Sequence, residues 1–347
     1  MRIALVCPYD LGAHGGVQDQ VIRLSRWLDD LGHETVIVGP GDEGPPGAVL
    51  VGSVKVIKAN AASTPITLSP KASSRLREAV EDVDVIHIHE PLMPMVSLAA
   101  SRISHIPTVG TFHADPPGWA RKGYSILSPL VKRVLSNLDV VTTVSPISRS
   151  AIEPFTLTRI IPNGIDTAAY APETKTSGRV VFLGRDDARK GLDVLLDAWP
   201  SIHAAFPGAS LHIMGATRDD PPQGATYLGR VDEATKIMEL ASSEIFVAPN
   251  LGGESFGIIV AEGMAAGNAV VASGIPAFLH VIGDAGVIVA PGDVSGLAQG
   301  IIALLDDPLR RANLGAMAID RVQRFDGHHV AEQYVAAYLD AIESHQV

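Results

Sequence analysis

The sequence predicts an α/β protein made of two doubly wound, Rossmann-like parallel-sheet domains. Short β-branched runs recur along the chain, and segments with helical periodicity lie between them. These runs are apolar at consecutive positions, as strands are when helices cover both faces of a parallel sheet. At 347 residues the chain also exceeds the size at which a single hydrophobic core stops growing, so two domains are expected.

In the first half of the chain the expected strands alternate with helices, as in a βαβ unit. The helix after the first strand places Val17, Val21, Leu24, Leu28 and Leu31 on one face. The expected strands cover residues 3–6, 36–38, 85–88, 108–112 and 140–144.

The second half repeats this alternation after a break at residues 160–178, "IIPNGIDTAAYAPETKTSG". The break is rich in Pro, Gly, Ser and Thr and has no strong periodicity, as is typical of a linker. After it, Leu192, Leu195, Leu196 and Trp199 share a helical face. The expected strands cover residues 180–183, 211–214, 245–248, 269–272 and 287–289.

Composition narrows the class of protein. Hydrophobic residues make up 46% and charged residues 19%, the profile of a well-buried globular protein. A net charge of −11 argues against a general nucleic-acid binder. The single cysteine, Cys7, forms no internal disulfide, which fits a reducing compartment. No signal peptide or membrane-spanning run is recognised, so a cytoplasmic protein is expected.

Ligands of doubly wound sheets bind at the carboxyl ends of the strands, here in a cleft between the domains. Gly15, Gly16 and Gln18 follow the first strand and open a helix, where backbone N–H groups attract an anion. A glycine turn that serves only chain reversal is the alternative. Arg185 and Lys190 follow the 180–183 strand, where two cations suit a diphosphate; two solvated surface charges are the alternative.

The stretch 249–273, "PNLGGESFGIIVAEGMAAGNAVVAS", carries the strongest pattern. A helix is expected to start near Ser255 or Phe256, with the preceding glycines wrapping a phosphate at its N-terminus. Glu254 enters from the loop and Glu262 about two turns along the helix, and each carboxylate can accept hydrogen bonds from sugar hydroxyls. For Glu262 the alternative is a buried glutamate paired with a cation, although the surrounding run contains no cation.

Glu254 and Glu262, with seven residues between them in "GGESFGIIVAE", resemble the E-x7-E motif of retaining glycosyltransferase family 4. The segments "GGVQ" (15–18), "TFH" (111–113), "IPNGID" (161–166), "LGR…KG" (183–191) and "YLGRVDEATK" (227–236) agree in order and spacing. Within the family, "VCPYD", "HIHEP" and "GTFHA" are similar to phosphatidylinositol mannosyltransferases. The resemblance covers nearly the whole chain.

The resemblance implies the GT-B fold, in which two Rossmann-like domains face a central cleft. Residues 1–165, with a C-terminal crossover helix at 328–347, would bind the acceptor. Residues 166–327 would bind the nucleotide-sugar donor. Both assignments follow from the family and not from the strand pattern.

The resemblance also assigns roles in the reaction. His113 would lie beside the anomeric carbon, Arg185 and Lys190 would stabilise the leaving diphosphate, and Glu254 would bind the transferred hexose. Glu262 would bind the ribose, and Glu233 would favour guanine. Transfer would retain configuration by front-side attack without a covalent enzyme intermediate. The implied donor contacts are Gly15, Gly16, Arg185, Lys190, Val231, Glu233, Lys236, Glu254, Ser255, Phe256, Gly257, Ile258 and Glu262.

On the acceptor side, the resemblance implies contacts from Tyr9, Gln18, Asn60 and His113. Segment 119–138 interleaves basic and apolar side chains, as interfacial helices on anionic lipid do. A helix whose apolar side is simply core is the alternative. The expected membrane contacts are Arg121, Lys122, Lys132 and Arg133.

Two further motifs are interpreted without a metal. "DVDV" (82–85) contains D-x-D but precedes a strand, away from its carboxyl end, and is expected to be a turn. His87 and His89 share a strand face without a third ligand nearby, so neutral histidines are expected. The resemblance implies no resident cofactor, and any Mg²⁺ would be bound only loosely.

Together these expectations describe a glycosyltransferase that moves mannose from GDP-mannose to a phosphatidylinositol-type lipid at the inner membrane face. The partners would be a nucleotide sugar, a phospholipid acceptor and an anionic membrane surface, with no nucleic acid and no obligate protein partner. Two alternatives stay open: the same chemistry with a UDP-sugar or another lipid or soluble acceptor, and a non-catalytic nucleotide-sugar binder.

Overall fold

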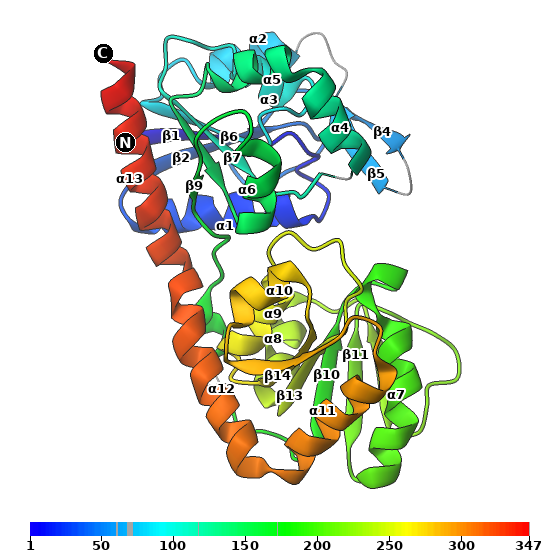
Figure 1. Cartoon of the computed structure of the whole chain (residues 1–347). Coiled ribbons are helices and arrows are strands. Elements are labelled where there is room, and N and C mark those ends of the chain that lie inside the picture. Colours follow the sequence, from blue (N-terminus) through cyan, green and yellow to red (C-terminus); the bar gives the residue numbers. More distant parts are fainter. Residues whose placement is uncertain (60–61, 68–71, 117, 172, 347) are drawn as a thin grey trace. The chain divides into compact units, whose positions relative to one another are not determined.

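A computed structural model describes residues 1–59, 62–67, 72–116, 118–171 and 173–346. The chain forms two compact units (Figure 1). Unit 1 comprises Met1–Gly164 with Gly327–Val347, and unit 2 comprises Ile165–Asp326.

The described residues of unit 1 form a seven-stranded parallel sheet in the order β3-β2-β1-β6-β7-β8-β9. Its strands are β1 (Arg2–Val6), β2 (Glu34–Gly39), β3 (Val49–Leu50), β6 (Val85–His89), β7 (Thr108–Phe112), β8 (Val140–Thr143) and β9 (Arg159–Ile160). The direction of winding changes at β1, the third strand of the sheet, because β2 lies on one side of it and β6 on the other. This switch point brings the loops after β1 and β6 next to each other.

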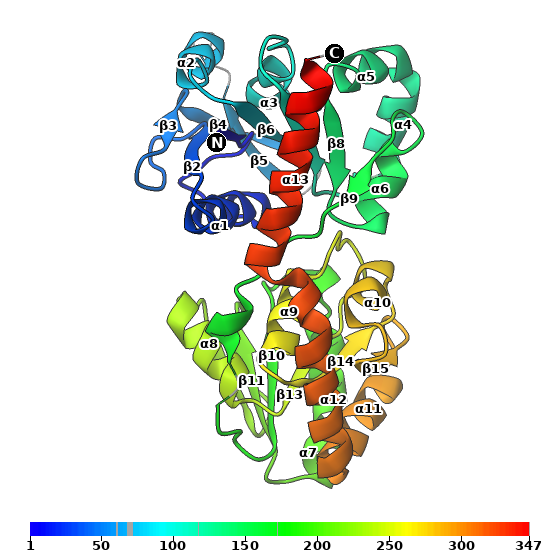
Figure 2. The same ribbon diagram turned by 90° about the vertical axis from the view of Figure 1, so that its left-hand side faces the viewer.

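Helices cover both faces of this sheet. Ile3 and Leu5 pack with α1 and α13, whereas Ala4 and Val6 face the opposite core. Helices α1 and α13 lie side by side (Figure 2). The helices of unit 1 are α1 (Gly16–Asp30), α2 (Ala72–Ala79), α3 (Val96–Ala100), α4 (Gly118–Ile126), α5 (Ser128–Leu135), α6 (Pro146–Ile152) and α13 (Gly327–His345). The C-terminal helix thus completes a core built by the first half of the chain.

The described residues of unit 2 form a six-stranded parallel sheet in the order β12-β11-β10-β13-β14-β15. Its strands are β10 (Arg179–Leu183), β11 (Ser210–Met214), β12 (Ala225–Gly229), β13 (Ile245–Ala248), β14 (Ala269–Ser273) and β15 (Gly286–Val289). Here β10 is the switch point, because β11 and β13 flank it.

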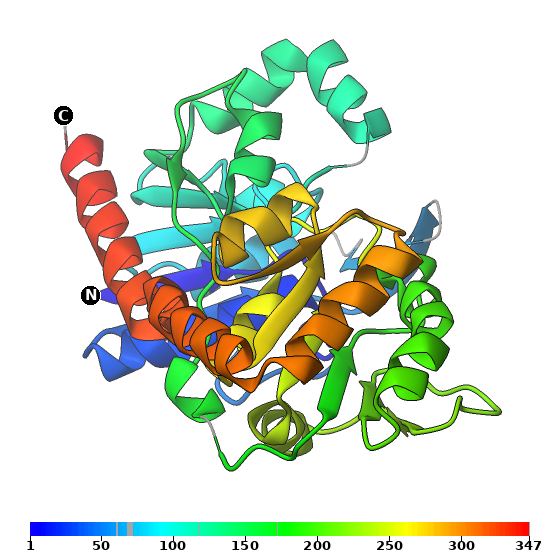
Figure 3. The ribbon, with the colours of Figure 1, turned by 60° about the horizontal axis from the view of Figure 1, so that its bottom comes forward.

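Helices α7 and α11 pack side by side over this sheet (Figure 3). The helical segments of unit 2 are η1 (Thr167–Tyr170), η2 (Ala188–Lys190), α7 (Leu192–Ala205), α8 (Glu233–Ser242), α9 (Ile258–Ala265), α10 (Pro276–Ile282), α11 (Val294–Asp306), α12 (Pro308–Val322) and η3 (Gln323–Phe325). No helix in the described part of either unit is long and apolar enough to cross a membrane.

The strands expected from apolar runs are confirmed, whereas other elements were not expected. Strands β3, β9 and β12 lie at sheet edges, and β4 (Val54–Ala59) pairs with β5 (Ala62–Thr67) as an antiparallel hairpin. Helix α9 begins at Ile258, so the expected start near Ser255 or Phe256 is wrong. Gly257 ends the preceding loop with φ 103°, a conformation that is costly for residues with a Cβ.

Candidate active site

Two loops of unit 2 meet at the carboxyl end of its sheet. One follows β10 and carries Arg185 and Lys190, and the other follows β13 and carries Glu254. The backbone N–H of Leu251 donates to the carbonyl of Arg189 at 2.8 Å, which joins the loops directly. Both predicted cations therefore emerge where ligands of such sheets bind.

Lys190 and Glu254 form an ion pair in this position. Their side chains are 19% and 17% exposed, so water screens the pair only partly. Asn250 also donates to Glu254 Oε1, at 2.8 Å. Arg185 is exposed and has no ion-pair partner within the described chain. The structure thus brings Lys190 and Glu254 together, and Arg185 lies exposed in the loop after β10.

The loop before α9 presents backbone rather than side chains. The N-cap is Gly257, which has no side chain, so no side-chain cap satisfies the first backbone N–H groups of α9. Phe256 is buried and packs edge to face on Phe325, with ring centroids 5.2 Å apart. The Phe256 side chain is core, which leaves its backbone for the donor contact that the resemblance implies, and this contact stays a prediction.

Glu262 is a buried carboxylate that already has a cation. Its side chain is 3% exposed, Lys236 Nζ lies 2.9 Å from its Oε1, and Tyr170 donates to the same oxygen at 2.8 Å. The structure therefore shows the alternative given for Glu262, a buried glutamate paired with a cation. The surrounding sequence contains none, but Lys236 reaches Glu262 from α8.

Glu233 and Val231 lie at the start of α8, beside this cluster. Glu233 is 56% exposed and binds Lys236 at 2.9 Å through Oε2, while Tyr170 lies 3.1 Å from its Oε1. Val231 is half-buried in the turn before the helix. Lys236 therefore joins Glu233 and Glu262, which the sequence had assigned to base and ribose.

At the carboxyl end of β1 in unit 1, Gly15 is the N-cap of α1 and has extended backbone, φ −166°. Gln18 lies in the first turn, is buried, and donates to the carbonyl of Asp10 at 3.2 Å. It folds back over Gly15, whose missing Cβ would approach its Oε1 to 2.4 Å. At Gly16 no described atom lies within 4 Å of an added Cβ, so a ligand has room there. Tyr9 lies half-buried in the same loop, and Asn60 lies outside the described residues.

His113, directly after β7, has both ring nitrogens engaged. Nδ1 donates to Asn163 Oδ1 at 3.1 Å, which leaves Nε2 to accept from Nδ1 of His89 at 2.8 Å. Burial lowers the pKa of His113 to about 4, so the ring is neutral. A sugar can contact a ring nitrogen of His113 only if one of these hydrogen bonds opens.

His87 and His89 are buried and neutral, because burial lowers the pKa of both well below the ordinary value. His87 bonds Tyr338 of α13 at 2.8 Å and Thr111 at 2.6 Å. No group of three His, Cys, Asp or Glu residues suited to a metal ion occurs in the described part of the chain. Asp84 of the D-x-D motif accepts from the backbone N–H of Arg2 at 2.7 Å, as a turn residue does.

Comparison with known proteins places this geometry in a family. The family model "Glycosyltransferase Family 4" matches residues 14–169, and "Glycosyl transferases group 1" matches residues 177–307. A phosphatidyl-myo-inositol mannosyltransferase of Mycolicibacterium smegmatis is 35% identical over 97% of this chain and 93% of its own. The chain belongs to glycosyltransferase family 4.

Solved structures agree on the fold of this family 4 glycosyltransferase. Sucrose-phosphate synthase from Thermosynechococcus elongatus superposes with a TM-score of 0.74 at 21% identity, over 97% of this chain and 98% of its own. Anabaena HepE, in complex with UDP and glucose, gives 0.76 at 18% identity, over 97% and 99%. The fold is therefore GT-B, as the motifs implied.

The basic segment of this glycosyltransferase has two different parts. Helix α4 has no fully buried residue: Tyr124 packs half-buried against the core, whereas Trp119 is 61% and Ile126 79% exposed. Helix α5 buries Val131, Val134 and Leu135 but leaves Leu130 exposed. The alternative of an apolar side that is core thus describes α5, whereas α4 adds the half-buried Tyr124 to the core and exposes Trp119 and Ile126.

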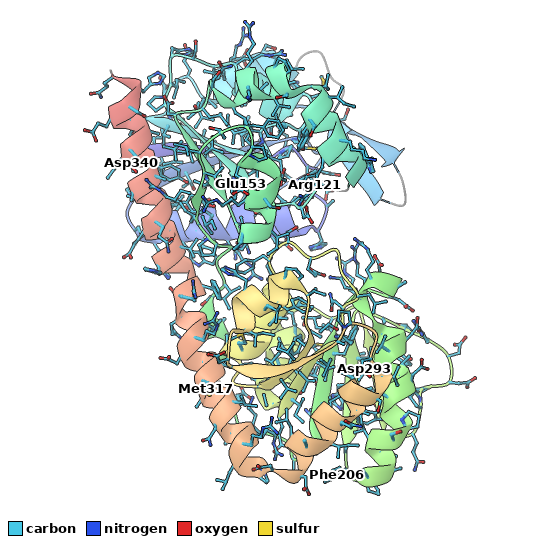
Figure 4. The ribbon with its side chains drawn as sticks, viewed as in Figure 1. Arg121, Glu153, Phe206, Asp293, Met317 and Asp340 are labelled. Carbon is cyan, nitrogen blue, oxygen red and sulfur yellow. The ribbon has the colours of Figure 1, made fainter. Side chains whose placement is uncertain are left out.

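Among the four basic residues, Lys122, Lys132 and Arg133 are exposed. Arg121 is half-buried, forms an ion pair with Asp115, and donates to Ser150 of α6 at 3.1 Å. Figure 4 labels Arg121 on α4 and Glu153 just after α6. Arg121 therefore anchors α4 to its own unit, because Asp115 just before the segment supplies the acidic partner.

Sequence reasoning missed Glu90, which follows His89 at the end of β6. Its Oε1 accepts from the backbone N–H groups of His113 and Ala114 at 2.7 and 2.8 Å. Burial raises its pKa to about 7. Its place in "HIHEP", after a strand, was a signal that a carboxylate reaches the same sheet edge as His113.

Proposed function

We propose that this glycosyltransferase transfers mannose from GDP-mannose to a hydroxyl of a phosphatidylinositol-type lipid, with retention of configuration. The observation that carries the proposal is the cluster of Arg185, Lys190 and Glu254 at the strand ends of unit 2. The similarity to the phosphatidyl-myo-inositol mannosyltransferase of Mycolicibacterium smegmatis, at 35% identity, supports the choice of mannose and inositol lipid.

The donor diphosphate would take the place of Glu254 as the partner of Lys190. Arg185, exposed in the same loop, adds a second cation, and the uncapped N-terminus of α9 adds backbone N–H groups. Glu254, released from Lys190, would then accept hydrogen bonds from hexose hydroxyls. Lys190 would thus bind the diphosphate of the donor, and Glu254 would bind its hexose.

The nucleoside would lie over the start of α8. Glu233 is the exposed carboxylate there, and it would accept hydrogen bonds from the N–H donors of guanine. Glu262 would accept from a ribose hydroxyl while Lys236 keeps its charge balanced. Uracil presents fewer N–H donors, so a preference for GDP over UDP is expected at Glu233.

The proposed chemistry needs no covalent enzyme intermediate. The bond from the anomeric carbon to the diphosphate oxygen breaks while the acceptor oxygen bonds the same carbon from the same face. The acceptor proton passes to the departing phosphate oxygen. Arg185 and Lys190 stabilise the charge that develops on that oxygen, as preorganised cations do in other transferases. A loosely held Mg²⁺ would arrive with the diphosphate.

The acceptor would bind at the carboxyl edge of the unit 1 sheet, near Tyr9, Gln18 and His113. Lipid delivery would use the exposed apolar and basic side chains of α4 and α5, from the inner face of the membrane.

The test supplies radiolabelled GDP-mannose, or UDP-glucose in parallel, to vesicles that contain phosphatidylinositol, and counts label in the organic phase. Mannose in lipid with little glucose is expected. If the labelled sugar is released only by hydrolysis into water, GDP-mannose stays the proposed donor and the lipid acceptor is rejected. A preference for UDP-glucose would reject GDP-mannose as the donor. Tight nucleotide-sugar binding with no turnover of either donor would indicate a non-catalytic binder.

Replacing Lys190 tests the donor geometry. Lys190→Met should lower kcat by about 100- to 1,000-fold, the usual effect of losing one charge-stabilising group. Arg189→Ala is the matched control, because Arg189 precedes Lys190 but pairs with Asp187 at 2.7 Å. Equal loss in both variants would mean that general charge, not the position of Lys190, matters.

A further inference from the structure

Arg218 joins three elements of unit 2 at the carboxyl end of its sheet. It lies in the loop after β11, and its guanidinium group pairs with Asp186 and Asp193. Nε lies 2.8 Å from Oδ2 of Asp186 and a terminal nitrogen lies 2.5 Å from Oδ1, so both oxygens of Asp186 are engaged. The other terminal nitrogen donates to Asp193, in the first turn of α7, at 2.5 Å. A bidentate pair of this kind fixes the orientation of both partners.

The acid that Arg218 holds is the direct neighbour of Arg185, the cation that the proposed function places on the donor diphosphate. The backbone N–H of Asp187 donates to the carbonyl of Arg185 at 2.8 Å, so the chain turns tightly at Asp186. A carboxylate and a flexible guanidinium group in one tight turn attract each other at short range. Arg185 nevertheless forms no ion pair among the described residues, whereas Asp186 pairs with Arg218.

The second acid of this turn is also occupied. Asp187 is the N-cap of η2 and accepts from the backbone N–H of Arg189 at 3.0 Å, and its other oxygen pairs with the Arg189 guanidinium group at 2.7 Å. Hydrogen bonds from Arg189 lower the pKa of Asp187 to about 2, and the charge of Arg185 adds to this effect. Because the backbone holds Asp187, Asp186 is the acid of this turn whose pairing depends on side chains alone.

Backbone packing brings the loop of Arg218 to this turn. A Cβ at Gly215 would lie 2.6 Å from the carbonyl oxygen of Gly184, and Gly215 has φ 89°, so glycine is required there. The backbone N–H of Gly184 donates to the carbonyl of Met214 at 3.0 Å. The loop after β11 therefore lies against the residue that precedes Arg185, and Arg218 reaches Asp186 without the help of a ligand.

We propose that Arg218 is a positioning residue that occupies Asp186 and so leaves the guanidinium group of Arg185 available to the diphosphate of the nucleotide sugar. This inference rests on the proposed function for the role of Arg185. Without Arg218, the carboxylate of Asp186 would pair with Arg185 and compete with the diphosphate for its N–H donors. In this role Arg218 acts through Asp186 and needs no contact with the donor.

Binding of GDP, measured by titration calorimetry, tests this role with a set of variants. We expect Arg218→Ala to weaken GDP binding about threefold to fivefold, because the diphosphate would first have to displace an exposed ion pair. Asp186→Asn alone should bind GDP as the wild type does. The double variant, Arg218→Ala with Asp186→Asn, should regain wild-type affinity, because no carboxylate remains beside Arg185 to replace the one that Arg218 held.

Asp193→Asn is the matched control, because it removes the other partner of Arg218 and leaves the bidentate pair with Asp186. It should bind GDP as the wild type does. If Arg218 only fastened the two loops together, Asp186→Asn would weaken GDP binding as much as Arg218→Ala does. The double variant would then show no recovery. Either result would overturn the proposal.

A readout without nucleotide separates this inference from the proposed function. Phenylglyoxal modifies arginine side chains, an ion pair slows its reaction, and mass spectrometry follows the peptide that contains Arg185. Arg185 should react several-fold more slowly in Arg218→Ala than in the wild type, and at the wild-type rate in the double variant. Equal rates in the wild type and Arg218→Ala would overturn the proposal. The slower reaction, together with no GDP binding by the wild type, would reject the proposed donor site and keep the pairing that Arg218 prevents.

Discussion

At the scale of single residues, the carboxyl edge of the unit 1 sheet contains a glutamate with a raised pKa and histidines with lowered pKa values. Burial raises the pKa of Glu90 to about 7 and lowers that of His113 to about 4. At neutral pH His87, His89 and His113 therefore carry no charge, whereas Glu90 is partly ionised. Of these four side chains, Glu90 is the one expected to titrate near pH 7.

Glu90→Gln should stabilise the protein at high pH. Below pH 4.5 the carboxyl group is protonated in both states and adds no penalty. As pH rises to 7 the unfolded chain ionises first, so folding stability falls, and above pH 7 the full cost of about 3 kcal/mol applies. We expect Glu90→Gln to unfold at higher urea than wild type at pH 8, by up to that amount.

The difference between the two proteins is the quantity to measure, since the buried histidines titrate equally in both. It should shrink to nothing as pH falls from 8 to 4. Tyr9, Tyr124 and His113, which surround Glu90, do not ionise between pH 7 and 8. A difference that stays constant with pH would mean that Glu90 has an ordinary pKa.

Part of the site could be predicted residue by residue. Arg185, Lys190 and Glu254 follow apolar strands, so local sequence placed them at the sheet edge. The partner of Glu262 could not be predicted, because Lys236 reaches it from another helix. The hydrogen bonds of Glu90 to the loop after β7 depend likewise on which strands are neighbours.

At the scale of elements, α4 contains no fully buried residue, although its Tyr124 packs half-buried against the core of unit 1. Its neighbour α5 is amphipathic in the usual way, with Val131 and Leu135 buried. Trp119, Leu127 and Leu130 thus remain exposed beside Lys122, Lys132 and Arg133. A surface of this composition is typical of helices that lie in a membrane interface.

Removing the three exposed cations, Lys122→Ala, Lys132→Ala and Arg133→Ala together, should weaken partitioning onto anionic vesicles on the order of 100-fold. Each basic residue near such a surface contributes about 1 kcal/mol. Arg121 stays, because its ion pair with Asp115 makes it structural. The measurement is co-sedimentation with vesicles containing phosphatidylserine.

Arg75→Ala, Arg77→Ala and Arg310→Ala form the matched control, since these arginines are exposed and the triple variant removes equal charge elsewhere. Its binding should change little. Equal losses of vesicle binding in the two triple variants would show that net charge alone causes the effect. Helices α4 and α5 would then be rejected as the membrane contact surface.

Elements differ in how well the sequence predicts them. Central strands such as β13 are buried on both faces and read as continuous apolar runs. Edge strand β12 contains half-buried residues and one exposed position, so its pattern is weak. The start of α9 was misplaced because Gly253 and Gly257 both have positive φ and extend the loop to Ile258.

At the scale of the whole molecule, unit 1 is discontinuous in sequence and unit 2 is not. Helix α13 buries Val330, Ala331, Tyr334 and Tyr338 in the core that α1 and β1 also line. Residues 1–164 alone would expose this face of their sheet. Residues 165–326 contain their own core.

A fragment of residues 165–326 should therefore unfold cooperatively in urea, whereas residues 1–164 should bind the dye ANS and unfold without a sharp transition. A permuted fragment that joins 327–347 by a Gly/Ser linker to 1–164 is the control, and it should regain cooperativity. Cooperative unfolding of 1–164 alone would show that α13 is dispensable for this core.

The indole ring of Trp27 lies next to both places where the chain passes from one unit to the other. A Cβ at Gly164 would lie 2.5 Å from the ring of Trp27, and one at Gly327 would lie 2.0 Å from it, so both passages touch the same side chain. The other two tryptophans differ from it, since Trp119 is 61% exposed and Trp199 is fully buried in unit 2. The intrinsic fluorescence of this protein thus contains three separable signals. Emission from Trp27 in a Trp119→Phe, Trp199→Phe background would report strain at the chain crossings as donor or acceptor binds, without any added label.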